Sequence, residues 1–283
     1  MNAPMIVRED PAEGVARVVL NRPEHHNAQN LALLYELDTA LSAAARDRAV
    51  KVIVLSANGP DFSSGHDVTE RHPLVPPRSV ATTEGVFDAD GIEGRHAFEC
   101  EAYLGLCRRW RDIPKPTIGQ AHGRTIAAGL MLLWPMDLIV AGESATFSDP
   151  VAAFGLNGHE YFVHPWEVGA RKAKEMLFTG EPFTAAEAHR LGMVNHVVPD
   201  DDLAGFTLDL AARIAQMPEY GLRLAKTAVN SSLAAQGQDV AIDSAFALHI
   251  AGHANNLTRY SEIIDPAGIE RIRALSRRRT NPT

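Results

Sequence analysis

The alternation of apolar and polar positions predicts strand, helix and strand over the first part of the chain. Apolar runs at residues 15–20 and 51–57 are typical of buried strands. Between them, residues 31–46 repeat apolar positions at helical spacing. The leucines that line one side of this helix are Leu33, Leu34, Leu37 and Leu41. Strands that alternate with helices in this way indicate an α/β architecture.

The pattern continues to about residue 200 and then becomes almost entirely helical. The further expected elements are helices at 96–112, 166–178 and 184–191, a short helix from 127 to about 134, a strand and turn at 116–123, and strands at 137–142, 145–150 and 192–199. Residues 71–95 show no clear periodicity and exceed the usual length of a connection. We therefore expect a lid or a mobile loop there, and a division into a core at 1–200 and a helical region at 201–283.

Composition narrows the class of protein. The 283 residues are 46% hydrophobic and carry a formal net charge of -8, which disfavours nucleic acid and anionic membranes as partners. No stretch approaches the ~18 consecutive apolar residues of a transmembrane helix, and no signal peptide is visible at the amino terminus. Cys100 and Cys107 are spaced about 10 Å apart along one predicted helix, too far for a disulfide. A reducing, cytoplasmic setting is therefore expected.

Two loops rich in small residues each follow a strand and lead toward a helix. They are "FSSGHD" at 62–67 and "HGRTIAAGLMLL" at 122–133. The start of a helix offers free backbone N–H groups and the positive end of the helix dipole. One N–H from each loop could converge on a carbonyl oxygen and form an oxyanion hole. The alternative is close packing of a helix on a sheet, which the spacing alone favours.

Five segments occur in a recognisable order. They are "LNRPEHHNAQN", "KVIVLSANGPDFSSGHDV", "IPKPTIGQAHGRTIAAG", "DLIVAGESATFSDP" and "AKEMLFTGEPFTAAEAHRLGMVNHVVP". With them the chain resembles the enoyl-CoA hydratase/isomerase family, or crotonase family, over residues 15–200 and more loosely beyond. The resemblance implies a spiral of ββα turns with a helical carboxyl-terminal region at 201–283 that forms a homotrimer or homohexamer. It also implies an acyl-CoA substrate, with no cofactor apart from the coenzyme A of that substrate.

The resemblance also implies roles for particular residues. The backbone N–H groups of His66 and Ala128 match the two donors that hold the thioester oxygen of the substrate. The residues expected along coenzyme A are Arg22, Glu24, Ala28, Asp67, Val68 and Thr69. Asp67 has an alternative role as a structural cap of the next turn.

The chain departs from the family pattern at both catalytic glutamates of the hydratases. Met131 and Val151 stand at those two positions, and neither side chain can hold or deprotonate water. General acid–base catalysis contributes typically ~10²–10⁴-fold to a rate. We therefore expect slow hydration of crotonyl-CoA, and an acyl pocket lined by Met131, Val151, Leu130 and Trp134.

Other residues could transfer protons. His159 and Glu160, in "GLNGHEYF", are the first candidates, because a catalytic aspartate of the family's dienoyl-CoA isomerases matches His159. Asp149 is the next, on the assumption that a strand places it on the same face as Val151. The alternative roles are structural: a buried or exposed histidine, and a loop hydrogen bond for Asp149. Glu99, beside the expected lid, is expected to be a solvated surface residue.

Competing classes lack their motifs. The chain has no G-x-S-x-G elbow of serine hydrolases and no G-x-G-x-x-G of dinucleotide-binding proteins. His159 and His164 are five apart, off one helical face, and no cysteine pair supports them, so no metal site is expected. Two functions remain: an acyl-CoA isomerase, decarboxylase or lyase that stabilises an enolate, or a catalytically silent acyl-CoA-binding protein.

Overall fold

The computed structural model describes residues 4–68, 85–87 and 89–280, which form one sheet of six strands and one of three. The strands are β1 (Ile6–Ala12), β2 (Val15–Leu20), β3 (Val52–Ala57), β4 (Thr117–Ala121), β5 (Arg124–Ile126), β6 (Leu138–Gly142), β7 (Thr146–Ser148), β8 (Phe183–Thr184) and β9 (His196–Val198). The large sheet has the order β1-β2-β3-β4-β6-β9, and the small one β5-β7-β8. β1 and β2 are antiparallel, and the following pairs of the large sheet are parallel. The expected α/β architecture is confirmed.

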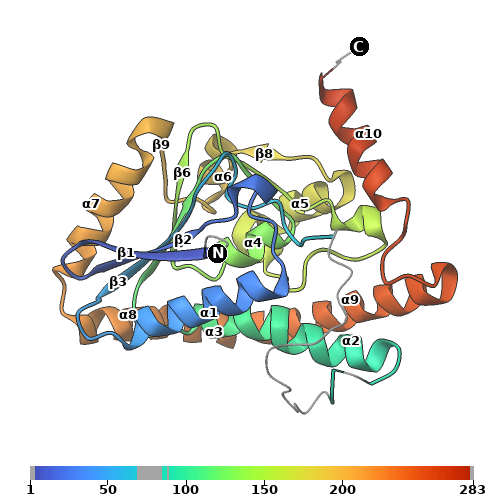
Figure 1. Cartoon of the computed structure of the whole chain (residues 1–283), viewed down its shortest axis with the longest axis horizontal. Helices are drawn as coiled ribbons and strands as arrows, with labels where there is room; N and C mark the ends of the chain where they lie inside the picture. The colour runs from blue at the N-terminus through green and yellow to red at the C-terminus, as the bar shows by residue number, and fades with distance from the viewer. Residues whose placement is uncertain (1–3, 69–84, 88, 281–283) are drawn as a thin grey trace.

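Helices cover the sheet and extend from it at the carboxyl end (Figure 1). They are α1 (Leu31–Arg46), α2 (Ile92–Glu99), α3 (Leu106–Arg111), α4 (Ala128–Leu133), α5 (His164–Thr179), α6 (Ala185–Leu191), α7 (Leu203–Ala215), α8 (Glu219–Ala235), α9 (Gln238–Tyr260) and α10 (Gly268–Thr280). A π-helix, η2 (Cys100–Gly105), joins α2 to α3. In Figure 1, α1, α3 and α8 run below the sheet, whereas α10 projects from the body.

The two faces of the large sheet pack against different helices. Side chains alternate between the faces along each strand. The residues of β2 and β3 that join α1 in the main core are Ala16, Val18, Leu20, Ile53 and Leu55. The sheet residues that pack with α7 on the other face are Val15, Val52, Val54, Ile118 and Val140. The helical spacing predicted for the α1 leucines is confirmed, since all four are buried.

Some elements differ from the sequence expectation. β1 was not expected, because it is an edge strand whose "REDPA" stretch is mostly exposed and lacks alternation. The helix expected from His96 begins at Ile92, after Gly91 with φ of +68°. Most of the lid expected at 71–95 lies outside the described residues, because residues 71–84 and 88 are among those not described. Among the described helices, none has the length and apolar character needed to cross a membrane.

Candidate active site

The two loops rich in small residues lie directly against each other. The Ile126 N–H donates to the Ser63 carbonyl oxygen at 3.0 Å. A β-carbon on Gly65 would lie 2.8 Å from the Ile126 carbonyl oxygen, and one on Gly129 would lie 2.7 Å from the Ser63 carbonyl oxygen. Side chains do not tolerate such distances from a backbone oxygen, so both positions require glycine. The small residues therefore allow a close approach of the two loops to each other.

The turn into α4 places a backbone donor beside the first loop. Ala127 has φ of +48°, which is uncommon for a residue with a side chain, and its N–H donates to the Ser148 carbonyl at 2.8 Å. The nitrogen of Ala128 lies 3.4 Å from the position of a β-carbon on Gly65. Within the described part of the chain, neither the Ala128 N–H nor the His66 N–H donates to a protein acceptor. Two unpaired donors on adjoining loops can hold a carbonyl oxygen.

The side chain of His66 pairs with Glu160. His66 Nε2 lies 3.3 Å from Glu160 Oε1, and the imidazole stacks on the Tyr103 ring with 4.2 Å between centroids. Burial alone raises the pKa of the Glu160 carboxyl, but the neighbouring His66 and His249 outweigh it and hold that pKa far below its usual range. Glu160 is therefore ionised at neutral pH, and His66 Nε2–H donates to it. The structure brings together two residues that the sequence analysis singled out separately.

A second carboxylate lies behind this pair. Glu99 is fully buried, so the expectation of a solvated surface residue is wrong. Its carboxylate forms an ion pair with Arg95, and His253 Nε2 lies 3.1 Å from Oε1. Burial raises the pKa of Glu99, and Arg95 and His253 together lower it below its ordinary value. His249 Nε2 lies between the two carboxylates, 3.7 Å from Glu99 Oε2 and 3.6 Å from Glu160 Oε1.

Sequence reasoning missed this cluster, although one signal pointed to it. His249 and His253 are four residues apart in "HIAGH", the spacing that places two side chains on one face of a helix. The carboxylate partner comes from a helix about 150 positions earlier, so local pattern does not show the contact.

Asp149 and His159 belong to a different buried group. β7 ends at Ser148 and a 3-10 helix begins at Val151, so the expectation that Asp149 and Val151 share a strand face is wrong. Asp149 accepts three hydrogen bonds: from His164 Nε2 at 2.8 Å, His159 N–H at 3.0 Å and Val151 N–H at 3.1 Å. Burial first, and then His164, lower the pKa of His159 to about 3. Its ring packs on Trp134 with 5.1 Å between centroids.

The positions of the two hydratase glutamates are apolar and enclosed. Met131 lies in α4 and Val151 starts the 3-10 helix, and both side chains are buried. Leu130 and Trp134, also expected in the acyl pocket, are buried as well.

The residues expected along coenzyme A are Arg22, Glu24, Ala28, Asp67, Val68 and Thr69. Three of them meet: Arg22 Nη1 donates to the Asp67 carboxylate at 2.8 Å and to the Ala28 carbonyl at 2.9 Å. This clamp joins the loop after β2 to the loop that carries His66. Glu24 and Val68 are exposed, and Thr69 lies outside the described residues.

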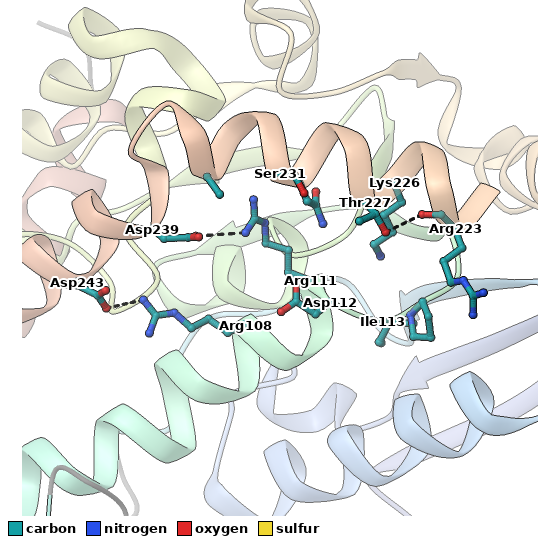
Figure 2. Close-up of a pocket in the computed structure, with 13 residues that line it drawn as sticks. Arg108, Arg111, Asp112, Ile113, Arg223, Lys226, Thr227, Ser231, Asp239 and Asp243 are labelled. Carbon is teal, nitrogen blue, oxygen red and sulfur yellow. Dashed lines mark hydrogen bonds and ion pairs between the residues drawn. The ribbon is translucent and has the colours of Figure 1, made fainter. Parts of the chain in front are cut away.

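A separate cavity of about 580 Å³ lies between α3, α8 and α9 (Figure 2). The charged residues that line it are Arg108, Arg111, Asp112, Arg223, Lys226, Asp239 and Asp243. Figure 2 shows Arg108 paired with Asp243 at 2.5 Å and Arg111 with Asp239 at 3.4 Å. These pairs neutralise much of the cationic charge, and the lining includes none of the residues predicted for the site.

Comparison with known proteins places this geometry in a family. The family model described as Enoyl-CoA hydratase/isomerase matches residues 10–263. The protein named "Putative enoyl-CoA hydratase EchA13" of Mycobacterium tuberculosis is 42% identical over 248 residues, which cover 85% of this chain and 78% of the relative. A solved structure of a probable enoyl-CoA hydratase from Mycobacterium smegmatis has 46% identity and a TM-score of 0.83, and the match covers 92% of this chain and 98% of that chain.

A monofunctional enoyl-CoA isomerase from M. smegmatis is also similar, with 28% identity and a TM-score of 0.64, over 81% of this chain and 93% of that chain. The architecture expected from the resemblance, a crotonase fold with a helical carboxyl-terminal region, is confirmed. The chain belongs to the enoyl-CoA hydratase/isomerase family.

Proposed function

We propose that the chain binds an acyl-CoA thioester, stabilises its enolate with the backbone N–H groups of His66 and Ala128, and moves a proton with the His66–Glu160 pair. The observation that carries the proposal is the contact between His66 Nε2 and Glu160 Oε1 at 3.3 Å, on the loop that also supplies an unpaired backbone donor. A histidine oriented by a carboxylate beside an oxyanion hole is a recurrent arrangement for proton transfer.

The pair fits this task better than the other two candidates. Glu160 accepts the Nε2 proton of His66, and His66 Nδ1 is buried without a hydrogen-bond partner among the described residues, so no protein donor occupies its lone pair. His159, with a pKa of about 3, is a weak base at neutral pH. The Asp149 carboxylate already accepts three hydrogen bonds.

The reaction class follows from which groups are missing. Met131 and Val151 cannot position water, so the site favours moving a proton between carbons of the acyl chain over adding water to a double bond. Double-bond isomerisation needs one group to take a proton and return it elsewhere, which a single His–Glu pair can do. Decarboxylation also needs an enolate without the glutamate pair. Either reaction uses no cofactor apart from the coenzyme A of the substrate.

Proton exchange tests the proposal. In deuterated water, NMR follows double-bond migration and deuterium incorporation at the carbon next to the thioester, over a panel of 3-enoyl-CoA and saturated acyl-CoA compounds. Glu160→Gln should lower kcat/KM by ~10²–10⁴-fold, with a smaller effect on KM. Glu175→Gln, on the exposed side of α5, is the matched control and should leave the rate unchanged.

Three results would contradict it. Full activity in Glu160→Gln would remove the pair from the chemistry. Acyl-CoA binding without exchange on any substrate would favour the silent binding protein. Efficient hydration of crotonyl-CoA by the unaltered chain would show that the missing glutamates do not matter.

We also propose that residues 201–283 form the interface between the protomers of a homotrimer or homohexamer. α8 has no buried residue, although it carries apolar side chains. The exposed apolar residues of α8 and α9 are Tyr220, Leu224, Val229, Val240 and Leu248, each at least 50% exposed. Apolar side chains left exposed on two helices that contact each other support an interface between protomers. Light scattering should give a trimeric or hexameric mass, and a monomeric mass would contradict the proposal.

A further inference from the structure

Two histidines of α9 present the same atom to the same carboxylate. His249 Nδ1 lies 2.9 Å from the Gly158 carbonyl, and His253 Nδ1 lies 2.5 Å from the Ile263 carbonyl. A carbonyl only accepts, so both Nδ1 atoms carry protons. In a neutral imidazole the Nε2 atom then has a lone pair, and both Nε2 atoms are directed toward Glu99. A backbone carbonyl that accepts the Nδ1 proton and so fixes the tautomer is typical of histidines that bind metals through Nε2.

The carboxylate is open on one side. Arg95 holds Glu99 Oε1, whereas Oε2 has no hydrogen-bond partner among the described residues. Nε2 of His249 and Nε2 of His253 likewise make no hydrogen bond within the described part of the chain. All three residues are buried. Lone pairs of two rings and a carboxylate that face one another in a buried site are unfavourable unless a proton or a metal cation lies among them. Although burial lowers the pKa of His253, Glu99 raises that pKa above its ordinary value, which shows that this cluster attracts positive charge.

The distances match the needs of a small metal ion. The ligand atoms of Glu99, His249 and His253 all lie within 4.8 Å of one another. Zinc bonds to nitrogen and oxygen are about 2.0–2.1 Å long, so tetrahedral geometry places ligand atoms roughly 3.4 Å apart. Measured separations are 3.1 Å from His253 Nε2 to Glu99 Oε1, and 3.7 and 3.6 Å from His249 Nε2 to Glu99 Oε2 and Glu160 Oε1.

We propose that Glu99, His249 and His253 bind a divalent transition-metal ion of the zinc class, with Glu160 Oε1 nearest to the fourth position. Two carboxylates face one guanidinium, Arg95, so the cluster with neutral histidines has an excess negative charge that a cation would balance. The ion would tie α9 to α2, which pack side by side (Figure 1). This site adjoins the proposed function at Glu160, but it is argued from Glu99, His249 and His253, and its test measures metal binding rather than activity.

The other buried histidine group provides the control. The ligand atoms of Asp149, His159 and His164 also lie within 4.8 Å of one another. There, however, His164 Nε2–H donates to Asp149, and two backbone N–H groups donate to the same carboxylate. A metal would have to displace these hydrogen bonds, so we expect no ion at that group.

Metal binding is measured on the full chain without substrate. Protein dialysed against a chelator is titrated with Co²⁺, and visible absorption reports a four-coordinate site. We expect one ion per chain, displaced by Zn²⁺, with nitrogen and oxygen ligands. His249→Gln and His253→Gln, made singly, should each weaken Co²⁺ binding by about 100-fold. His164→Gln should leave binding unchanged, and circular dichroism verifies that each variant is folded.

Several results would overturn the proposal. No saturable binding of Co²⁺ or Zn²⁺ by the folded unaltered chain would mean that the histidines are protonated instead. Loss of binding in His164→Gln, with binding retained in the α9 variants, would move the site to the other group. Equal binding in all variants would show attachment to surface histidines only.

Discussion

Two buried groups each combine one carboxylate with two histidines, but the hydrogen bonds of the carboxylate differ between them. Asp149 with His159 and His164 has its carboxylate surrounded by N–H donors. Glu99 with His249 and His253 faces ring nitrogens whose protons are directed elsewhere. Residue composition therefore does not tell a structural cluster from a ligand site, whereas the position of each proton does. The first group fastens the turn after β7, and the second stays open to a cation.

The largest loss of stability is expected when the hydrogen bonds of the Asp149 group are removed. Asp149→Ala leaves His164 and two backbone N–H groups buried without their acceptor, which typically costs about 3–5 kcal/mol of unfolding free energy. Urea unfolding at pH 7 measures this loss. Asp239→Ala, which breaks an exposed pair with Arg111, should cost at most about 1 kcal/mol. Equal losses in both variants would show that the buried hydrogen bonds of Asp149 contribute no more to stability than an exposed ion pair does.

A third carboxyl, that of Glu167, behaves in the opposite way, because its pKa is raised rather than lowered. Glu167 of α5 is largely enclosed, and burial, only partly offset by Arg111, raises its pKa from 4.5 to about 7. Its protonated form is favoured in the fold, so its contribution to stability is present below pH ~4.5 and is lost as the pH rises through about 7. Glu167→Gln should therefore stabilise the chain by about 3 kcal/mol at pH 8.

The same substitution should have no effect at pH 4, where the glutamate is already protonated. Urea midpoints at the two pH values measure the difference. A stabilisation that is equal at both would assign the effect to packing rather than to charge.

Much of the fold follows from local pattern. β2 and α1 coincide with the expected 15–20 and 31–46, because each is apolar on the side that meets the core. Thr184 accepts from the Glu187 N–H at 3.2 Å, as a helix-start pattern predicts. β1 was not predicted, because an edge strand that is mostly exposed does not need to alternate apolar and polar residues.

The site was predictable in part, for a physical reason. Small residues at 65 and 129 indicate a close approach wherever they occur, so the meeting of the two loops could be expected. The burial of Glu99 could not be expected, because a carboxylate is buried only if other residues balance its charge, and some of these are distant in the sequence. Arg95 lies on the same helix, but His249 and His253 come from α9.

The π-helix at Cys100–Gly105 determines which way that carboxylate is directed. A π turn holds one residue more than an α turn, and one residue corresponds to about 100° of rotation. Upstream of η2 the helix directs Glu99 to α9, and downstream Cys107 Sγ–H donates to the Met131 carbonyl at 3.4 Å beneath α4. In a chain one residue shorter here, the two halves would be out of phase by a quarter turn or more. The length of this segment, as much as its side chains, therefore sets the angular register between the oxyanion loops and the buried cluster.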